Sequence, residues 1–98
     1  MRRVVVTGIG LVTPLAGTTE ASWQSLIAGK SGLSKITRFK VDDIPAQVAG
    51  HVPIGEGAED FNADRYMAPK EQRKVDTFIK FGIGAASQAV EDSGWVPQ

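Results

Sequence analysis

Near its beginning the chain carries an unbroken apolar run, Val4–Val6, and Gly8 follows closely. Such a short run of β-branched residues, bounded by glycine, is typical of a strand that is buried on both faces of a parallel sheet. The pattern therefore predicts a strand over Arg3–Thr7.

Apolar residues at helical spacing come next. Trp23, Leu26 and Ile27 stand at positions i, i+3 and i+4, which gives one apolar helix face. We expect this helix to begin at Glu20, to be capped by one of the two threonines before it, and to stop at Gly29. A strand, a glycine-rich turn and a helix in this order predict an α/β fold.

Glycines and prolines interrupt residues 30–60, which predicts a long connection with brief extended pieces. Within it, Gln47–Gly50 is expected to form a short strand and Gly55–Asp60 an exposed tip. A connection this long inside a compact domain is often functional or packed against something larger.

The clearest pattern begins at Pro69 and predicts one helix that runs to Ser93, with Gly94 as its stop. The helix is apolar around most of its circumference, which is typical of a helix inside a large protein. Small residues in its middle would allow another backbone to approach closely. The one polar face of the helix is a stripe formed by Thr77, Lys80, Gly84, Ser87 and Gln88. Because one strand and this helix cannot cover each other, we expect the 98 residues to be an incomplete part of a fold.

Composition excludes several classes of protein. The chain holds 11 Lys plus Arg, 11 Asp plus Glu and no Cys, and 42% of its residues are hydrophobic. These values argue against a disordered chain and against a strongly basic nucleic-acid-binding domain. Without cysteine the sequence offers no disulfide, thiolate metal site or cysteine nucleophile.

Met1–Arg3 before the valines is similar to the start of a secretory signal, but Gly8, Gly10 and Pro14 soon interrupt the apolar run, so a strand is favoured.

The charges lie in blocks although their sum is zero. Residues 1–40 carry six positive and one negative side chain, and residues 41–64 carry six acids and no base. Residues 65–80 return to five positive and two negative side chains, and residues 81–98 carry two acids. Blocks of one sign can create local fields that attract partners of the opposite sign.

Three other features offer little chemistry. Gly8-Ile9-Gly10 is similar to part of a dinucleotide-binding fingerprint, but Thr13 occupies the place of the third small residue, so a tight strand exit is favoured. His51 lies in a loop without catalytic or metal-ligand partners nearby in sequence, which favours a solvated histidine. The acids of residues 42–64 lack the alternation of a calcium loop. The residues themselves therefore indicate no catalytic residue, metal site or cofactor.

Lys70, Arg73 and Lys74 form the most informative cluster. At i, i+3 and i+4 of a helix they would make one cationic patch near its N-terminal end. Such a patch either keeps an apolar helix soluble or docks an acidic partner through long-range attraction.

Several segments together resemble the beginning of the β-ketoacyl-acyl carrier protein synthases, and the cationic run resembles the type II (FabF-like) branch of that family. The segments are Arg3–Gly10, Thr13–Pro14, Trp23 with Leu26, Gly29–Gly32, and Lys70–Asp76 followed by Phe78–Ile79. The similarity extends over essentially the whole chain.

The resemblance implies the N-terminal part of a thiolase-like, layered α-β-α-β-α fold, usually homodimeric and cytoplasmic, with no cofactor. It implies a decarboxylating Claisen condensation of acyl and malonyl groups on acyl carrier protein, in fatty-acid elongation. The family's catalytic cysteine, histidines and lysine cannot be assigned to any residue of this sequence. Lys70, Arg73 and Lys74 match the family's carrier-protein-binding positions, with Arg65 and Lys80 as weaker candidates at the rim.

Two other hypotheses stay open. The chain could be a non-catalytic module that binds an acidic protein, which requires it to fold alone. It could also belong to a catalytically inactive partner of a condensing enzyme. The resemblance favours an active synthase, of which residues 1–98 would not be an independent domain.

Overall fold

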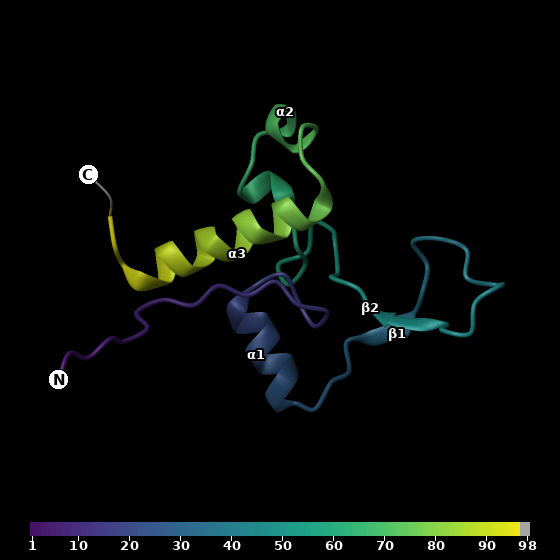
Figure 1. The fold of residues 1–98 in the computed structure, drawn as a ribbon, viewed down its shortest axis with the longest axis horizontal. Helices are drawn as coiled ribbons and strands as arrows, with labels where there is room; N and C mark the ends of the chain where they lie inside the picture. Colours follow the sequence, from purple (N-terminus) through teal and green to yellow (C-terminus); the bar gives the residue numbers. More distant parts are fainter. Residues whose placement is uncertain (97–98) are drawn as a thin grey trace.

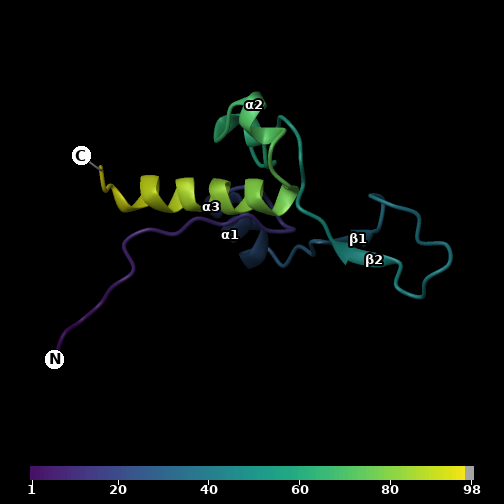
Figure 2. The ribbon, with the colours of Figure 1, turned by 45° about the horizontal axis from the view of Figure 1, so that its top comes forward.

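Helix α3, Thr77–Ser93, is the longest element of the computed structural model, which describes residues 1–96 (Figure 1). The elements before it are helix α1 (Thr19–Ile27), strands β1 (Leu33–Lys35) and β2 (Val48–Gly50), the short 3-10 helix η1 (Ala63–Arg65) and helix α2 (Pro69–Gln72). The N-terminal segment runs along α3, and α1 and α2 extend from it in opposite directions (Figure 1). The hairpin of β1 and β2 projects sideways (Figure 2).

The helix predicted over residues 69–93 is two helices. α2 begins at Pro69 as predicted but ends at Gln72 with Arg73 as its C-cap, and Asp76 has extended dihedral angles (φ −77°, ψ 164°) that interrupt the helical path. Aspartate favours the N-cap position, where the backbone is not yet helical, so Asp76 is a natural point at which to restart the helix. The predicted end is confirmed: Gly94 adopts the left-handed conformation (φ 72°) that terminates many helices.

The N-terminal segment packs on α3 by close approach of the two backbones. A Cβ atom on Gly10 would collide with the carbonyl oxygen of Ala85, and one on Gly8 with that of Ala89. The Ile9 amide donates to an Asp92 carboxylate oxygen at 3.0 Å. The expectation of a close backbone approach to α3 is therefore confirmed, and the two glycines serve packing.

The strand predicted over Arg3–Thr7 does not form in the described residues. The run is extended, and the exposed fractions of Val4, Val5 and Val6 are 91%, 65% and 80%. Within residues 1–96 the only paired strands are β1 and β2, which pair with each other. A strand needs a neighbour to complete its hydrogen bonds, and no segment described here supplies one.

Gln88 of α3 holds the N-terminal half against the helix. Its side-chain oxygen accepts from the amide (2.9 Å) and hydroxyl (2.9 Å) of Thr19 and from the amide of Leu11 (3.3 Å). Its amide nitrogen donates to the carbonyl of Gly17 (2.8 Å) and to the hydroxyl of Tyr66 (3.3 Å). One glutamine thus bonds to backbone groups at both ends of the turn over residues 11–19, where the Leu11 amide also donates to the Thr19 hydroxyl at 3.0 Å.

The polar stripe of α3 is divided between the inside and the outside of the structure. Gly84 is buried and Gln88 is half-buried against the rest of the chain, whereas Thr77 and Ser87 are exposed. Apolar side chains are also exposed, because Phe78, Ile83 and Val90 are 71%, 36% and 42% exposed. The hydrogen bonds of Gln88 and the close approach at Gly84 select the inward face.

α1 begins at Thr19, one residue before the predicted Glu20, and its cap and stop are among those predicted. Thr18 is its N-cap and accepts from the Ala21 amide at 3.3 Å, and Gly29 follows its end with φ 74°. Its predicted apolar face is open, because Trp23, Leu26 and Ile27 are 53%, 59% and 59% exposed.

The connection of residues 30–60 contains the antiparallel pair β1–β2, with Leu33 opposite Gly50. The short strand expected within Gln47–Gly50 is therefore confirmed. Beyond the pair, the Gln47 side chain donates to the carbonyls of Val41 (2.7 Å) and Ile44 (2.6 Å) and closes the intervening loop.

The small core lies between α3 and residues 61–66. Phe61 is 2% exposed, contacts Phe81 edge-on with ring centres 5.0 Å apart, and stacks on Tyr66 at 5.7 Å. Gly84 gives Phe61 room, because a Cβ there would lie 2.5 Å from its ring.

No helix within residues 1–96 is long and apolar enough to cross a membrane.

We predict that Gln88→Glu destabilises the protein by about 2 kcal/mol, because the carboxylate cannot donate to Gly17 and its oxygen would face that carbonyl. Chemical denaturation measures the change in the free energy of unfolding. Gln24→Glu on α1 is the matched control, because it also removes a donor, here from an exposed bond to Glu20 (2.9 Å), and should cost less than about 1 kcal/mol. Equal losses in the two variants would contradict the role of Gln88.

Candidate functional site: a cationic tip on α2

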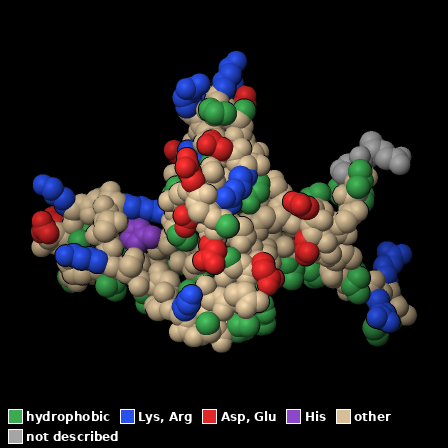
Figure 3. Space-filling model, turned by 180° about the vertical axis from the view of Figure 1, so that it is seen from behind, with side chains coloured by type: hydrophobic (Ala, Val, Ile, Leu, Met, Phe, Trp, Pro, Cys, Tyr) green, Lys and Arg blue, Asp and Glu red, His purple; other side chains and the backbone are tan. Residues whose placement is uncertain are grey.

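Helix α2 and the turn after it form a tip that stands away from α3 (Figure 1). Lys70, Arg73 and Lys74 are all exposed on this tip, and Figure 3 shows basic side chains gathered at its end. Because Arg73 is the C-cap of α2 and retains helical dihedral angles (φ −70°, ψ −14°), Lys70 and Arg73 keep the predicted i, i+3 spacing. Lys74 lies one residue further, in the turn. We call these three side chains the cationic tip.

Most of the charge of the tip is directed to solvent. Lys74 forms an ion pair with Glu71 at 3.6 Å, in which the two side chains are 61% and 59% exposed. An ion pair this exposed contributes little free energy, so it restrains Lys74 only weakly. Among residues 1–96, Lys70 and Arg73 make no ion pair. The cations of the tip can therefore pair with an acidic partner without first breaking a strong ion pair within the described residues.

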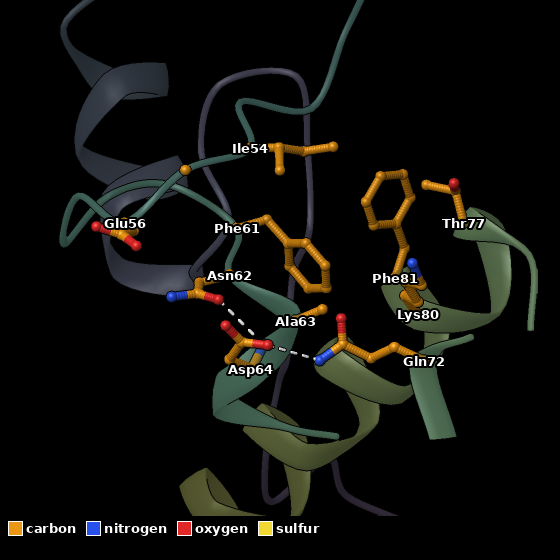
Figure 4. A pocket seen from close by; sticks show the side chains of 11 residues that line it. Ile54, Glu56, Phe61, Asn62, Ala63, Asp64, Gln72, Thr77, Lys80 and Phe81 are labelled. Atoms are coloured by element: carbon orange, nitrogen blue, oxygen red, sulfur yellow. Dashed lines mark hydrogen bonds between the residues drawn. The ribbon is translucent and has the colours of Figure 1, made fainter. Parts of the chain in front are cut away.

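A cavity of about 280 Å³ lies beneath the cationic tip, between α2, η1 and the beginning of α3 (Figure 4). Phe61 and Phe81 form its apolar wall, and Asp64 and Gln72 lie along one side. The Gln72 amide nitrogen donates to an Asp64 carboxylate oxygen at 2.7 Å and to the Met67 carbonyl at 2.9 Å. These two hydrogen bonds of Gln72 join the cationic tip to the residues that precede it.

Arg65 and Lys80, the candidates for the rim, have other surroundings. The Arg65 guanidinium donates to the carbonyls of Gly57 (3.0 Å), Asp60 (3.3 Å) and Glu56 (3.5 Å). It therefore holds the exposed turn expected at residues 55–60. Lys80 is half-buried and lines the cavity, so it lies below the exposed end of the tip.

The other sequence candidates are not brought together with the tip. His51 is half-buried, and its Nε2 atom is shielded without a hydrogen-bond partner in the described residues, so the prediction of a solvated histidine is wrong. His51 directly follows β2, in the segment that leads from the projecting hairpin back to η1. No group of three or more potential metal ligands occurs within residues 1–96.

Comparison with known proteins shows the family to which this chain belongs. Residues 1–98 match the family model of the β-ketoacyl synthase N-terminal domain. The chain belongs to the β-ketoacyl synthase family. A 3-oxoacyl-(acyl-carrier-protein) synthase 2 of Rhizobium meliloti (strain 1021) is 50% identical over 99 residues, covering 100% of this chain and 24% of the relative. The same-named protein of Vibrio cholerae serotype O1 is 44% identical over 93 residues, covering 95% of this chain and 21% of the relative.

A solved structure agrees with the sequence relatives. The ishigamide ketosynthase/chain length factor superposes with a TM-score of 0.79 at 32% identity, over 97% of this chain and 22% of that one. The resemblance to the type II β-ketoacyl synthases is thereby confirmed. This chain of the β-ketoacyl synthase family spans about a quarter of the length of the curated relatives it matches.

Sequence reasoning missed Gln72 and the hold of Arg65 on the neighbouring turn. Gln72 stands inside the cationic run, where it reads as one more polar surface residue. A signal was available, because one position along a helix turns a side chain by about 100°, so Gln72 cannot share the outward face of both Lys70 and Arg73. Its hydrogen-bond partners could not be read from the sequence.

We predict that Arg65→Lys loosens the turn over residues 55–60, since a lysine ammonium cannot span three carbonyls as the guanidinium does. Hydrogen exchange in the full-length protein should then be roughly fivefold faster at the Asp60 amide. Arg73→Lys makes the same chemical change on the exposed tip and should leave that exchange unaltered. Unchanged exchange in Arg65→Lys would show that the guanidinium does not hold the turn.

Proposed function

We propose that this chain is the N-terminal part of a type II condensing enzyme of fatty-acid elongation, and that the cationic tip docks acyl carrier protein. The observation that carries the docking role is the exposed set Lys70, Arg73 and Lys74 on a projecting element. Its relatives are named as synthases that act on a carrier protein. An acidic carrier would be steered to such a tip by long-range attraction and released readily, because the contacts stay close to solvent.

The reaction is a decarboxylating Claisen condensation. A thiolate attacks the acyl thioester on the carrier, which forms an acyl-enzyme and releases the carrier thiol. Malonyl-carrier protein then loses CO₂, and the resulting carbanion attacks the acyl-enzyme to give a 3-oxoacyl-carrier protein and restore the thiolate. Since this sequence has no cysteine, the nucleophile belongs to another part of the full-length protein. The described residues contribute fold and docking.

The exposed apolar surfaces support a larger fold. Trp23, Leu26 and Ile27 on α1 and the outer face of α3 are open to solvent although their pattern is that of buried positions. In the proposed full-length protein they are covered by the remaining layers of an α-β-α-β-α fold, and Val4–Val6 pairs within its sheet. We further propose that this protein is a cytoplasmic homodimer that needs no cofactor.

We predict that reversing two charges, Arg73→Glu with Lys74→Glu, weakens carrier binding by the full-length protein about tenfold at low salt and flattens its salt dependence. Titration calorimetry or a binding isotherm at several salt concentrations measures both effects. Lys35→Glu with Lys40→Glu is the matched control, because it makes the same charge change on the projecting hairpin. Equal affinity of the wild type and the tip variant at low salt would refute the docking role.

We predict that the full-length protein forms 3-oxoacyl products from acyl- and malonyl-carrier protein, whereas the isolated 98 residues form none and show no cooperative thermal transition. The isolated chain should form no product because it has no cysteine nucleophile. It should show no cooperative transition because its core is small, with Phe61 as the only buried aromatic side chain of the described residues. A cooperative transition of the isolated chain would favour the non-catalytic interaction module. A full-length protein that binds carrier without forming product would be a catalytically inactive partner.

A further inference from the structure

Gln72 differs from every other residue of the run over residues 70–74. The four neighbours are exposed, whereas Gln72 is half-buried and its side chain extends towards η1 along the wall of the cavity (Figure 4). Its amide nitrogen makes two short contacts, to the Asp64 carboxylate (2.7 Å) and the Met67 carbonyl (2.9 Å). The same segment therefore presents three cations outward and one amide inward.

Helix α2 depends on such tertiary contacts for its position. It has four residues, and its N-cap Ala68 makes no side-chain hydrogen bond to it. A helix this short has no stability of its own, because the cost of nucleation is not recovered within a single turn. The bonds of Gln72 link the end of α2 to residues that precede it by five and eight positions. Asp64 is itself fixed, because its amide donates to the Asn62 side chain at 3.0 Å.

We infer that Gln72 is a positioning residue, which through Asp64 holds the three cations of the tip in one arrangement for an acidic protein partner. The inference rests on the docking role proposed above and adds the hydrogen bond that holds the cations in position before the partner binds. Cations on a loosely held turn would have to be ordered when the partner binds, which lowers affinity, whereas a fastened turn presents them already in place.

Two substitutions at the exposed Asp64 separate positioning from charge. Asp64→Asn and Asp64→Ala each remove the same negative charge beside the tip, but only asparagine retains a side-chain oxygen that can accept from Gln72. If charge alone mattered, both variants would bind acyl carrier protein equally, and more tightly than the wild type. We expect Asp64→Ala to bind about fivefold more weakly than Asp64→Asn, since one hydrogen bond of ordinary net strength changes an equilibrium by about that factor.

Gln72→Leu tests the other end of the contact without any change in charge. In the full-length protein it should raise KM for the carrier-bound substrate rather than lower kcat, and flatten the salt dependence of binding although every cation remains. Adding Asp64→Ala to Gln72→Leu should weaken binding little further, because the shared contact is already lost. A role in overall stability alone would give neither the changed salt dependence nor this lack of additivity.

The outcomes distinguish the inference from the proposed function. Equal affinities of Asp64→Asn and Asp64→Ala would overturn the positioning role while leaving the docking role intact. Full carrier affinity after reversal of Arg73 and Lys74 would instead overturn docking itself. If Gln72→Leu does not fold, the Asp64 pair still decides, because that side chain is exposed.

Discussion

The side-chain amide of Gln88 is the contact on which the described structure depends. It joins α3 to the turn before α1 and to Tyr66, through partners that lie between 22 and 77 residues away in sequence. Around it, Gly8 and Gly10 bring the N-terminal backbone onto α3 at a distance that no side chain would permit. A polar network of this kind fixes orientation, because each amide and carbonyl has one geometry in which it is satisfied.

This network also explains why the apolar face of α3 is left open. The helix has a face that can hydrogen-bond to the turn and a face that can only be buried by other apolar groups. The described residues supply partners for the first face and too little apolar surface for the second. Phe61 and Phe81 form a small core beside η1 and α2. This core does not cover the apolar side chains on the outer side of α3. The apolar face of α3 and the apolar face of α1 are accordingly exposed in the described residues.

The proposed docking role places two requirements on the short segment of the cationic tip. Recognition of an acidic carrier protein needs cations in water, and a defined arrangement of those cations needs contacts to the protein below. Lys70 and Arg73 meet the first requirement and Gln72 the second, because successive positions of a helix face different directions. Arg65, although positive, serves the neighbouring turn. The number of cations in a segment therefore does not give the number available to a partner.

The sequence by itself determined the features that depend on neighbouring residues. The Thr18 cap, the start at Pro69 and the stop at Gly94 follow from contacts within one helical turn, and the cationic run and the family can be recognised from residue order alone. Only the tertiary structure decided which face of α3 turns inward and which groups hold α2. Those outcomes depend on hydrogen bonds and close approaches between residues remote in sequence, whose geometry a pattern of polar and apolar positions does not contain.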